Sequence, residues 1–300
     1  MSPSRFVDLG RFMLVSPAAR RLVAEADDRL GYSVVDRFRD TEGDYSEYAQ
    51  VGFMVCCLAL AEWARDELGF EPDVCAGASF GEKPLTVFTG VLPYPDAVEM
   101  TARLARCMDE FFATEHRDVV THSFIRTPEA GLGEVLAELD GRGEWYDISC
   151  YLDHDFFMVS LREKNLEWLE REIRGLGGLS LYTMRPPMHS GAFDALRRKA
   201  EREVIGELPF ADPKLPVVAD QDGAVLHTAE AVRTMLLESF VRPLRWPDVV
   251  ATLKRLGVGT VCVAGPDSLF GRVGCTTANF EVIAANPRLA LQPRRRGAAG

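Results

Sequence analysis

Apolar positions recur with a helical period through the first third of the chain. Residues 18–30 and 45–68 carry apolar side chains three or four positions apart, and a glycine follows each segment. A short apolar run at residues 74–76 is typical of a buried strand, and residues 95–112 again show helical spacing. We therefore predict that the first third is mainly helical, with one strand.

From about residue 118 the pattern favours an α+β unit. Strands and helices are indicated in the order strand 118–126, helix 129–139, strands 145–152 and 156–162, helix 166–176 and strand 179–184. This β-α-β-β-α-β order is that of the ferredoxin-like motif. We expect residues 118–182 to form a small inserted subdomain.

The remainder of the chain alternates helices and strands. The predicted segments are helix 193–205, strand 215–219, helices 229–240 and 247–256, and strand 260–264. Such alternation is typical of a mostly parallel sheet covered by helices. The predicted fold class is therefore α/β: residues 1–117 and 183–300 form a hydrolase-like sheet flanked by helices, with the ferredoxin-like insertion between them.

Composition and charge narrow the function classes. The 300 residues include 34 Lys and Arg against 45 Asp and Glu, a formal net charge of −11, so we expect no nucleic-acid partner. The longest apolar run, residues 51–60, is too short to span a bilayer, and the N-terminus lacks a signal-peptide pattern. Seven Cys without a C-x-x-C pair and five dispersed His indicate reduced thiols, a cytoplasmic location and no metal site.

The sharpest local motif is G-A-S-F-G at residues 77–81, which follows a predicted strand and opens a predicted helix. This is the setting of a nucleophile elbow, in which small neighbours let the chain turn sharply and expose the hydroxyl of Ser79. The amide of Phe80 then lies at a helix start and is a candidate oxyanion donor. The spacing alone is a weak signal, because Gly and Ser are common in ordinary turns.

A serine nucleophile requires a base, and His189 is the best candidate. It lies in the run RPPMHS, directly after the predicted insertion, where two prolines restrict the backbone ahead of a helix. A solvent-facing histidine at a helix start is the alternative. The other histidines have weaker contexts, in turns, loops or strand ends: His116, His122, His154 and His227.

Residues 77–92 (GASFGEKPLTVFTGVL) resemble the elbow block of the malonyl-CoA:acyl-carrier-protein transacylase family, which usually reads G-H-S-x-G-E. The P-x-H-S run at His189 and the insertion before it also fall in the family's order. So do three later motifs, Pro216-Val217-Val218, Arg242-Pro243-Leu244-Arg245-Trp246 and Gly265-Pro266. The resemblance extends from about residue 6 to residue 285.

The resemblance implies a ping-pong acyl transfer. Ser79 would attack an acyl thioester and hold the acyl group as an ester, and His189 would take the serine proton and later activate the incoming thiol. The acceptor implied is an acyl carrier protein, and the donor is acyl-CoA or an acylated carrier protein. No cofactor is implied beyond the 4′-phosphopantetheine that the substrate itself carries.

Departures from the family pattern concern the acyl pocket. The family places an Arg for the malonyl carboxylate 25 residues after the nucleophile, and here that position is Leu104. Ala78 replaces the usual His before the nucleophile, and Met188 precedes the base. Because a buried carboxylate requires a cation, we expect an acyl group other than malonyl, either neutral, larger or aminoacyl. The alternative is that Arg103 or Arg106 supplies the missing charge.

Two supporting roles follow from the same resemblance. The family's first strand and its Gly-Gln-Gly-Ser loop, which donates the second oxyanion hydrogen bond, would align Met1 with the Gln, so the large domain is expected to lack its first strand. The main-chain carbonyl that orients the base is expected at Ser239. An acidic enzyme that binds an acidic carrier protein needs a local basic patch, for which the weak candidates are Arg185, Arg197, Arg198, Lys199 and Arg202.

The function predicted is transfer of a non-malonyl acyl group from an acyl thioester to an acyl carrier protein by a trans-acting enzyme of polyketide-type biosynthesis. Three alternatives stay open. The first is an acyl-carrier-protein hydrolase that uses the same Ser79 and His189 but accepts water. The others are a true malonyl transacylase and a catalytically inactive scaffold that binds carrier protein.

Overall fold

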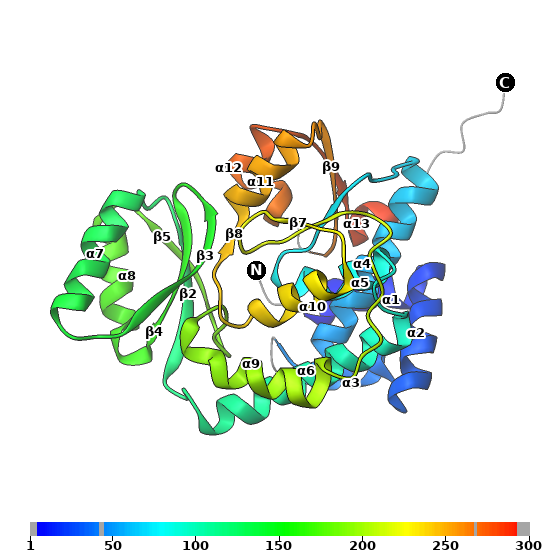
Figure 1. Ribbon diagram of the computed structural model, residues 1–300, viewed down its shortest axis with the longest axis horizontal. Coiled ribbons are helices and arrows are strands. Elements are labelled where there is room, and N and C mark those ends of the chain that lie inside the picture. The colour runs from blue at the N-terminus through cyan, green and yellow to red at the C-terminus, as the bar shows by residue number, and fades with distance from the viewer. Residues whose placement is uncertain (1–4, 42–44, 267–268, 293–300) are drawn as a thin grey trace.

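A computed structural model describes residues 5–41, 45–266 and 269–292. The chain forms a large helix-rich domain and a smaller domain that projects to one side of it (Figure 1). The smaller domain is the segment between β2 (Val119–Ile125) and β5 (Leu179–Met184). This architecture confirms the predicted α/β fold class.

Helices dominate the N-terminal part of the large domain. They are α1 (Phe6–Val15), α2 (Pro17–Leu30), α3 (Val34–Asp40), α4 (Glu47–Leu68) and α6 (Tyr94–Thr114). Ser16 and Ser46 cap α2 and α4, and Gly31 and Gly69 end them with φ angles of 76° and 65°. Helices α2, α4 and α6 confirm the predicted periodicity, whereas α1 and α3 were not predicted.

The central helix α4 explains the long apolar run of the sequence. Most of its residues between 49 and 60 are buried, so the helix packs on nearly all sides, against α1, α2, α3 and α6. Among the described residues, no helix is both long enough and apolar enough to cross a membrane.

The smaller domain has one five-stranded sheet in the order β5-β2-β4-β3-β8, completed by β3 (Tyr146–Asp153), β4 (Phe156–Arg162) and β8 (Leu244–Arg245). Its two helices, α7 (Glu129–Gly141) and α8 (Leu166–Gly175), pack with the sheet around a separate core that includes Phe124, Leu132 and Phe157. Strands β2 to β5 have the order and antiparallel pairing of a ferredoxin-like unit. Strand β8, which adds in parallel to β3, was not predicted and ties this sheet to the large domain.

The strands of the large domain form two short sheets. In one, β1 (Cys75–Ala76) pairs in parallel with β6 (Val217–Val218), which pairs with β7 (Val225–Leu226). In the other, β9 (Thr260–Ala264) pairs in parallel with β10 (Glu281–Ala285). The accompanying helices are α5 (Glu82–Phe88), α9 (Asp194–Ala200), α10 (Ala229–Glu238), α11 (Trp246–Arg255), α12 (Gly274–Thr277) and α13 (Pro287–Ala290).

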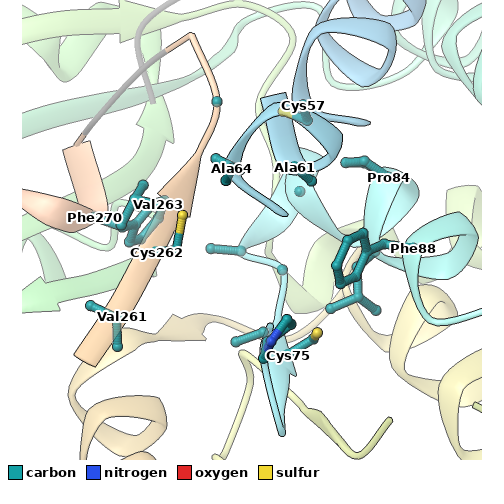
Figure 2. A pocket seen from close by; sticks show the side chains of 18 of the residues that line it. Cys57, Ala61, Ala64, Cys75, Pro84, Phe88, Val261, Cys262, Val263 and Phe270 are labelled. Atoms are coloured by element: carbon teal, nitrogen blue, oxygen red, sulfur yellow. The ribbon is translucent and has the colours of Figure 1, made fainter. Parts of the chain in front are cut away.

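A cavity of about 540 Å³ separates the two sheets. Residues of β1 line one side of the cavity and residues of β9 line the other, and within the described residues no strand lies between β1 and β9 to join the two sheets. Figure 2 shows Cys57, Ala61 and Ala64 of α4 between Val261–Val263 of β9 and Phe88 of α5. Most of the side chains around the cavity are therefore apolar, and each of its two strands has one edge that no strand pairs with in the part of the chain that the structure describes.

Candidate active site

The elbow is built at the end of β1, where the chain turns through a short 3-10 segment (Ser79–Gly81) into α5. Ser79 has a φ of 53°, a left-handed conformation that a non-glycine residue rarely adopts. A Cβ at Gly77 would lie 2.4 Å from the carbonyl oxygen of Gly81, so only glycine fits at position 77. A Cβ at Gly81 would meet nothing within 4 Å, so the second glycine of the motif is not required by space.

Ser79 and His189 lie in contact although 110 residues separate them. The Oγ of Ser79 is 2.9 Å from Nε2 of His189, and the two residues are only 5% and 3% exposed. His189 also has a positive φ, 60°, and the next residue is fixed by a hydrogen bond from the Ser190 amide to the Phe240 carbonyl. The backbone on both sides therefore holds the hydroxyl and the imidazole together.

Burial sets the charge of the imidazole. Loss of solvent, with a smaller contribution from the charge of Lys83, lowers the pKa of His189 to about 4, while the main-chain carbonyl of Ser239 opposes this shift. The Nδ1 atom makes no hydrogen bond of good geometry among the described residues. At neutral pH the ring is therefore uncharged, as a group that accepts a proton from Ser79 must be.

A buried acidic pair lies behind the nucleophile. Oδ2 of Asp220 accepts a 2.7 Å hydrogen bond from the Ser79 amide. Burial and the neighbouring Asp220 carboxylate raise the pKa of Glu82 well above its usual range, and burial raises the pKa of Asp220 to about 6. This shift favours the protonated form of Glu82, which accepts a 3.1 Å hydrogen bond from Gln221 Nε2. The sequence analysis did not identify this pair, because Asp220 is 141 residues from Ser79.

Ser79 opens on a small pocket of about 20 Å³, room for roughly one or two water molecules. Most of the side chains that line it are apolar, and the lining comes from the 3-10 turn at Ser79, α5, α6, the loop before His189, α10 and the residues just after α10. The full lining, polar residues included, is Ser79, Phe80, Glu82, Lys83, Leu104, Met108, Met188, Leu236, Ser239 and Phe240. An acyl group would have to displace side chains here, and the two methionines are the most adaptable of them.

The structure brings some of the predicted pocket residues to Ser79 and not others. Leu104 and Met188 line the small pocket. Ala78 faces the larger cavity between β1 and β9 instead. Arg103 and Arg106 are absent from the pocket lining, because Arg103 hydrogen-bonds the carbonyl of Glu203 and Arg106 Nη1 is 2.6 Å from Glu47 Oε1.

The pocket nevertheless contains one cationic side chain, which the sequence analysis missed. Lys83 lies four residues after Ser79, a spacing that places two residues on the same face of a helix. That spacing was visible in the printed sequence and is the signal that would have identified it.

The remaining predicted residues lie away from the dyad or outside the description. The five candidate carrier-binding residues all pair with carboxylates: Arg185 with Glu163, Arg197 and Arg198 with Asp194, and Lys199 and Arg202 with Glu203. These ion pairs compensate part of the positive charge of the patch. Met1, the predicted second oxyanion donor, lies outside the described residues.

An α/β domain with a ferredoxin-like insertion and a buried Ser–His pair on a sharp strand–helix turn is the arrangement that the resemblance to the transacylases led us to expect. The chain is 24% identical over 292 residues to the malonyl CoA-acyl carrier protein transacylase of Bacillus subtilis (strain 168), covering 94% of this chain and 90% of that protein. It is also 24% identical to a segment of the polyketide synthase GfsA of Streptomyces halstedii, covering 88% of this chain and 4% of that protein. Residues 123–184 match the family model described as the VinK acyltransferase small domain.

Solved structures show the same fold. A malonyl-transacylase in complex with a type II polyketide synthase acyl-carrier protein superposes with a TM-score of 0.82 at 20% identity, covering 96% of this chain and 93% of that chain. The acyl-carrier-protein S-malonyltransferase of Burkholderia pseudomallei 1710b gives a TM-score of 0.82 at 21% identity, covering 96% of this chain and 95% of that chain. The resemblance to the malonyl-CoA:acyl-carrier-protein transacylase family is therefore confirmed over nearly the whole chain.

Proposed function

We propose that this protein transfers an acyl group from an acyl thioester to an acyl carrier protein through an ester on Ser79. The observation that carries the proposal is the buried 2.9 Å contact between Ser79 Oγ and the uncharged Nε2 of His189. A hydroxyl next to a neutral imidazole in a small pocket is the arrangement that nucleophilic acyl transfer requires.

The two half-reactions use the same pair of residues. Ser79 Oγ attacks the thioester carbon while Nε2 of His189 takes its proton, and collapse of the tetrahedral adduct breaks the C–S bond and protonates the leaving thiolate. The thiol of the carrier protein then loses its proton to His189 and attacks the ester, which returns the hydroxyl to Ser79. The Phe80 amide is the proposed oxyanion donor, because it directly follows the nucleophile in the 3-10 turn that leads into α5.

The acyl group is proposed to be other than malonyl. Leu104 occupies the position from which the family's arginine would reach the pocket, and the guanidinium groups of Arg103 and Arg106 are engaged by other partners. A malonyl carboxylate in this pocket would lack a two-pronged cationic partner, and a buried charge without one is costly.

The partner and setting are proposed from the relatives. Solved transacylases of this fold include one bound to a polyketide acyl-carrier protein, and one relative is a polyketide synthase. A carrier protein of polyketide-type biosynthesis is therefore the proposed acceptor. The seven free cysteines fit a reducing compartment, so we propose a cytoplasmic location.

The test is intact-mass measurement after brief exposure to malonyl, acetyl, medium-chain and aminoacyl thioesters, each on coenzyme A and on a carrier protein. A persistent adduct with a non-malonyl donor, absent in Ser79→Ala and passed on when free carrier protein is added, is the expected result. A malonyl adduct alone would overturn the substrate assignment. Thiol release without an adduct would identify a hydrolase, and neither adduct nor release would identify a non-catalytic scaffold.

A further inference from the structure

Lys83 is the one Lys or Arg side chain among the described residues that line the Ser79 pocket. It lies on α5, one helical turn beyond the nucleophile, and faces a lining of Leu, Met and Phe side chains. Its charge also reaches His189, whose pKa it helps to lower. An acyl group bound to Ser79 would therefore lie within the field of this side chain.

The ammonium group is incompletely satisfied inside the protein. Its Nζ donates a 3.1 Å hydrogen bond to Gln50 Oε1 and lies 4.7 Å from the centre of the Phe80 ring. An ammonium group has three donors, and Gln50 supplies the single hydrogen bond recorded for it within the described residues. Loss of solvent lowers the pKa of Lys83 to about 8, so the group is still mainly charged at neutral pH.

The neighbouring acid is not the hydrogen-bond partner of this group, since the hydrogen bond recorded for Lys83 Nζ in the described part of the chain goes to Gln50. Burial and Asp220 raise the pKa of Glu82, which favours its uncharged form, and burial is the largest influence on the pKa of Lys83. A buried donor without a partner destabilises its surroundings, and an acceptor supplied by a ligand removes that cost. The vacant donors of Lys83 thus favour a ligand with an oxygen acceptor in the acyl chain.

We propose that Lys83 is a specificity-determining residue, and that it selects neutral acyl groups that carry a carbonyl or amide oxygen close to the thioester. The inference rests on the proposed acyl transfer at Ser79. A free aminoacyl group is disfavoured, because its ammonium would face that of Lys83. A carboxylate is disfavoured by the cost of removing its charge from water, which one ammonium compensates less completely than the two parallel donors of a guanidinium would.

The experiment measures the rate at which Ser79 is acylated by three pantetheine thioesters of similar length. These are butyryl, which has no acceptor, 3-oxobutyryl, which has a neutral acceptor, and malonyl, which has a carboxylate. Wild type is compared with Lys83→Met, which keeps length but removes the donors, with Lys83→Arg, and with the exposed control Lys254→Met on α11. Thermal melting of each variant separates misfolding from altered preference.

The informative quantity is the change in rate ratio, since 3-oxobutyryl is intrinsically the more reactive thioester. Loss of a charge-assisted hydrogen bond should lower the 3-oxobutyryl to butyryl ratio about tenfold or more in Lys83→Met, with partial recovery in Lys83→Arg and no change in Lys254→Met. An unchanged ratio in a folded Lys83→Met variant that still forms the ester would overturn the role of Lys83 and leave the proposed function standing. A Lys83-dependent preference for malonyl would overturn the proposal that the selected acyl groups are neutral. Absence of any ester in wild type would overturn both the role of Lys83 and the proposed acyl transfer at Ser79.

Discussion

The pH dependence of acylation tests the electrostatics of the site directly. Because burial lowers the pKa of His189 to about 4 from an ordinary value of 6.5, the neutral form that accepts the Ser79 proton should persist into mildly acidic solution. At pH 5.5 a histidine with a pKa of about 4 is about 97% neutral, whereas one with the ordinary value is about 9% neutral. The expected acylation rate is therefore almost constant between pH 7.5 and 5.5, where an unperturbed histidine would give about a tenfold loss.

The assay is single-turnover formation of the Ser79 ester, quenched and quantified by mass, with a butyryl pantetheine thioester. This donor does not titrate in the range used, and it avoids the phosphates of coenzyme A. Two other groups of the site titrate in or near this range: Asp220, whose pKa is raised to about 6, and Lys83, whose pKa is lowered to about 8 and which begins to lose its proton at the upper end. Asp220→Asn keeps an oxygen that accepts from the Ser79 amide but removes the ionisation of Asp220.

Circular dichroism at each pH confirms that the protein remains folded. A fall in the acylation rate with a midpoint near pH 6.5 in both wild type and Asp220→Asn would refute the reasoning, because it would show that His189 titrates as if it were exposed to water. A midpoint near 6 in wild type that disappears in Asp220→Asn would assign the ionisation to the acidic pair instead.

Three further predictions concern the elbow, the pocket and the small domain. Gly77→Ala should abolish ester formation, because its Cβ would overlap the carbonyl of Gly81, while Gly81→Ala should retain it within a fewfold; equal activity of the two variants would contradict the close approach. Leu104→Arg should raise the malonyl to butyryl acylation ratio about tenfold or more by pairing with the carboxylate, and an unchanged ratio in the folded variant would show that position 104 does not face the acyl group. Phe157→Ala, in the core of the small domain, should lower the free energy of unfolding by about 3–5 kcal/mol in urea titrations, against about 0.5 kcal/mol for the partly exposed Leu176→Ala.

The sequence predicted the elements of the small domain well, for a physical reason. Its strands and helices alternate over short distances, so the pattern of each segment and the order of the segments are both local information. Strand β8 escaped prediction because its two residues pair with β3 only through a contact between positions that lie far apart in the chain. Strand β10, Glu281–Ala285, was also not predicted, because its apolar and polar residues do not alternate strongly and its strand conformation depends on pairing with β9.

The site was predictable only in part. The strand–turn–helix setting of Ser79 is local, and the run around His189 marks a constrained segment, but their 2.9 Å contact joins positions 110 apart in the chain. The hydrogen bond from the Ser79 amide to Asp220 is a long-range contact of the same kind. The place of Ala78 also depends on the turn: this residue is still extended and lines the cavity between β1 and β9, whereas Ser79, with its φ of 53°, lines the small pocket.

The gap between β1 and β9 has a consequence for amide hydrogen exchange. Successive amides of a strand point alternately to its two edges, and β9 has a described partner, β10, on only one of them. Amides of β9 that face β10 should exchange slowly with deuterated solvent, whereas those that face the cavity should exchange much faster, unlike β2, which is paired on both edges by β4 and β5. Any segment that pairs with the open edge of β9 would abolish this alternation, so the exchange pattern along five residues is a direct record of whether that edge is occupied.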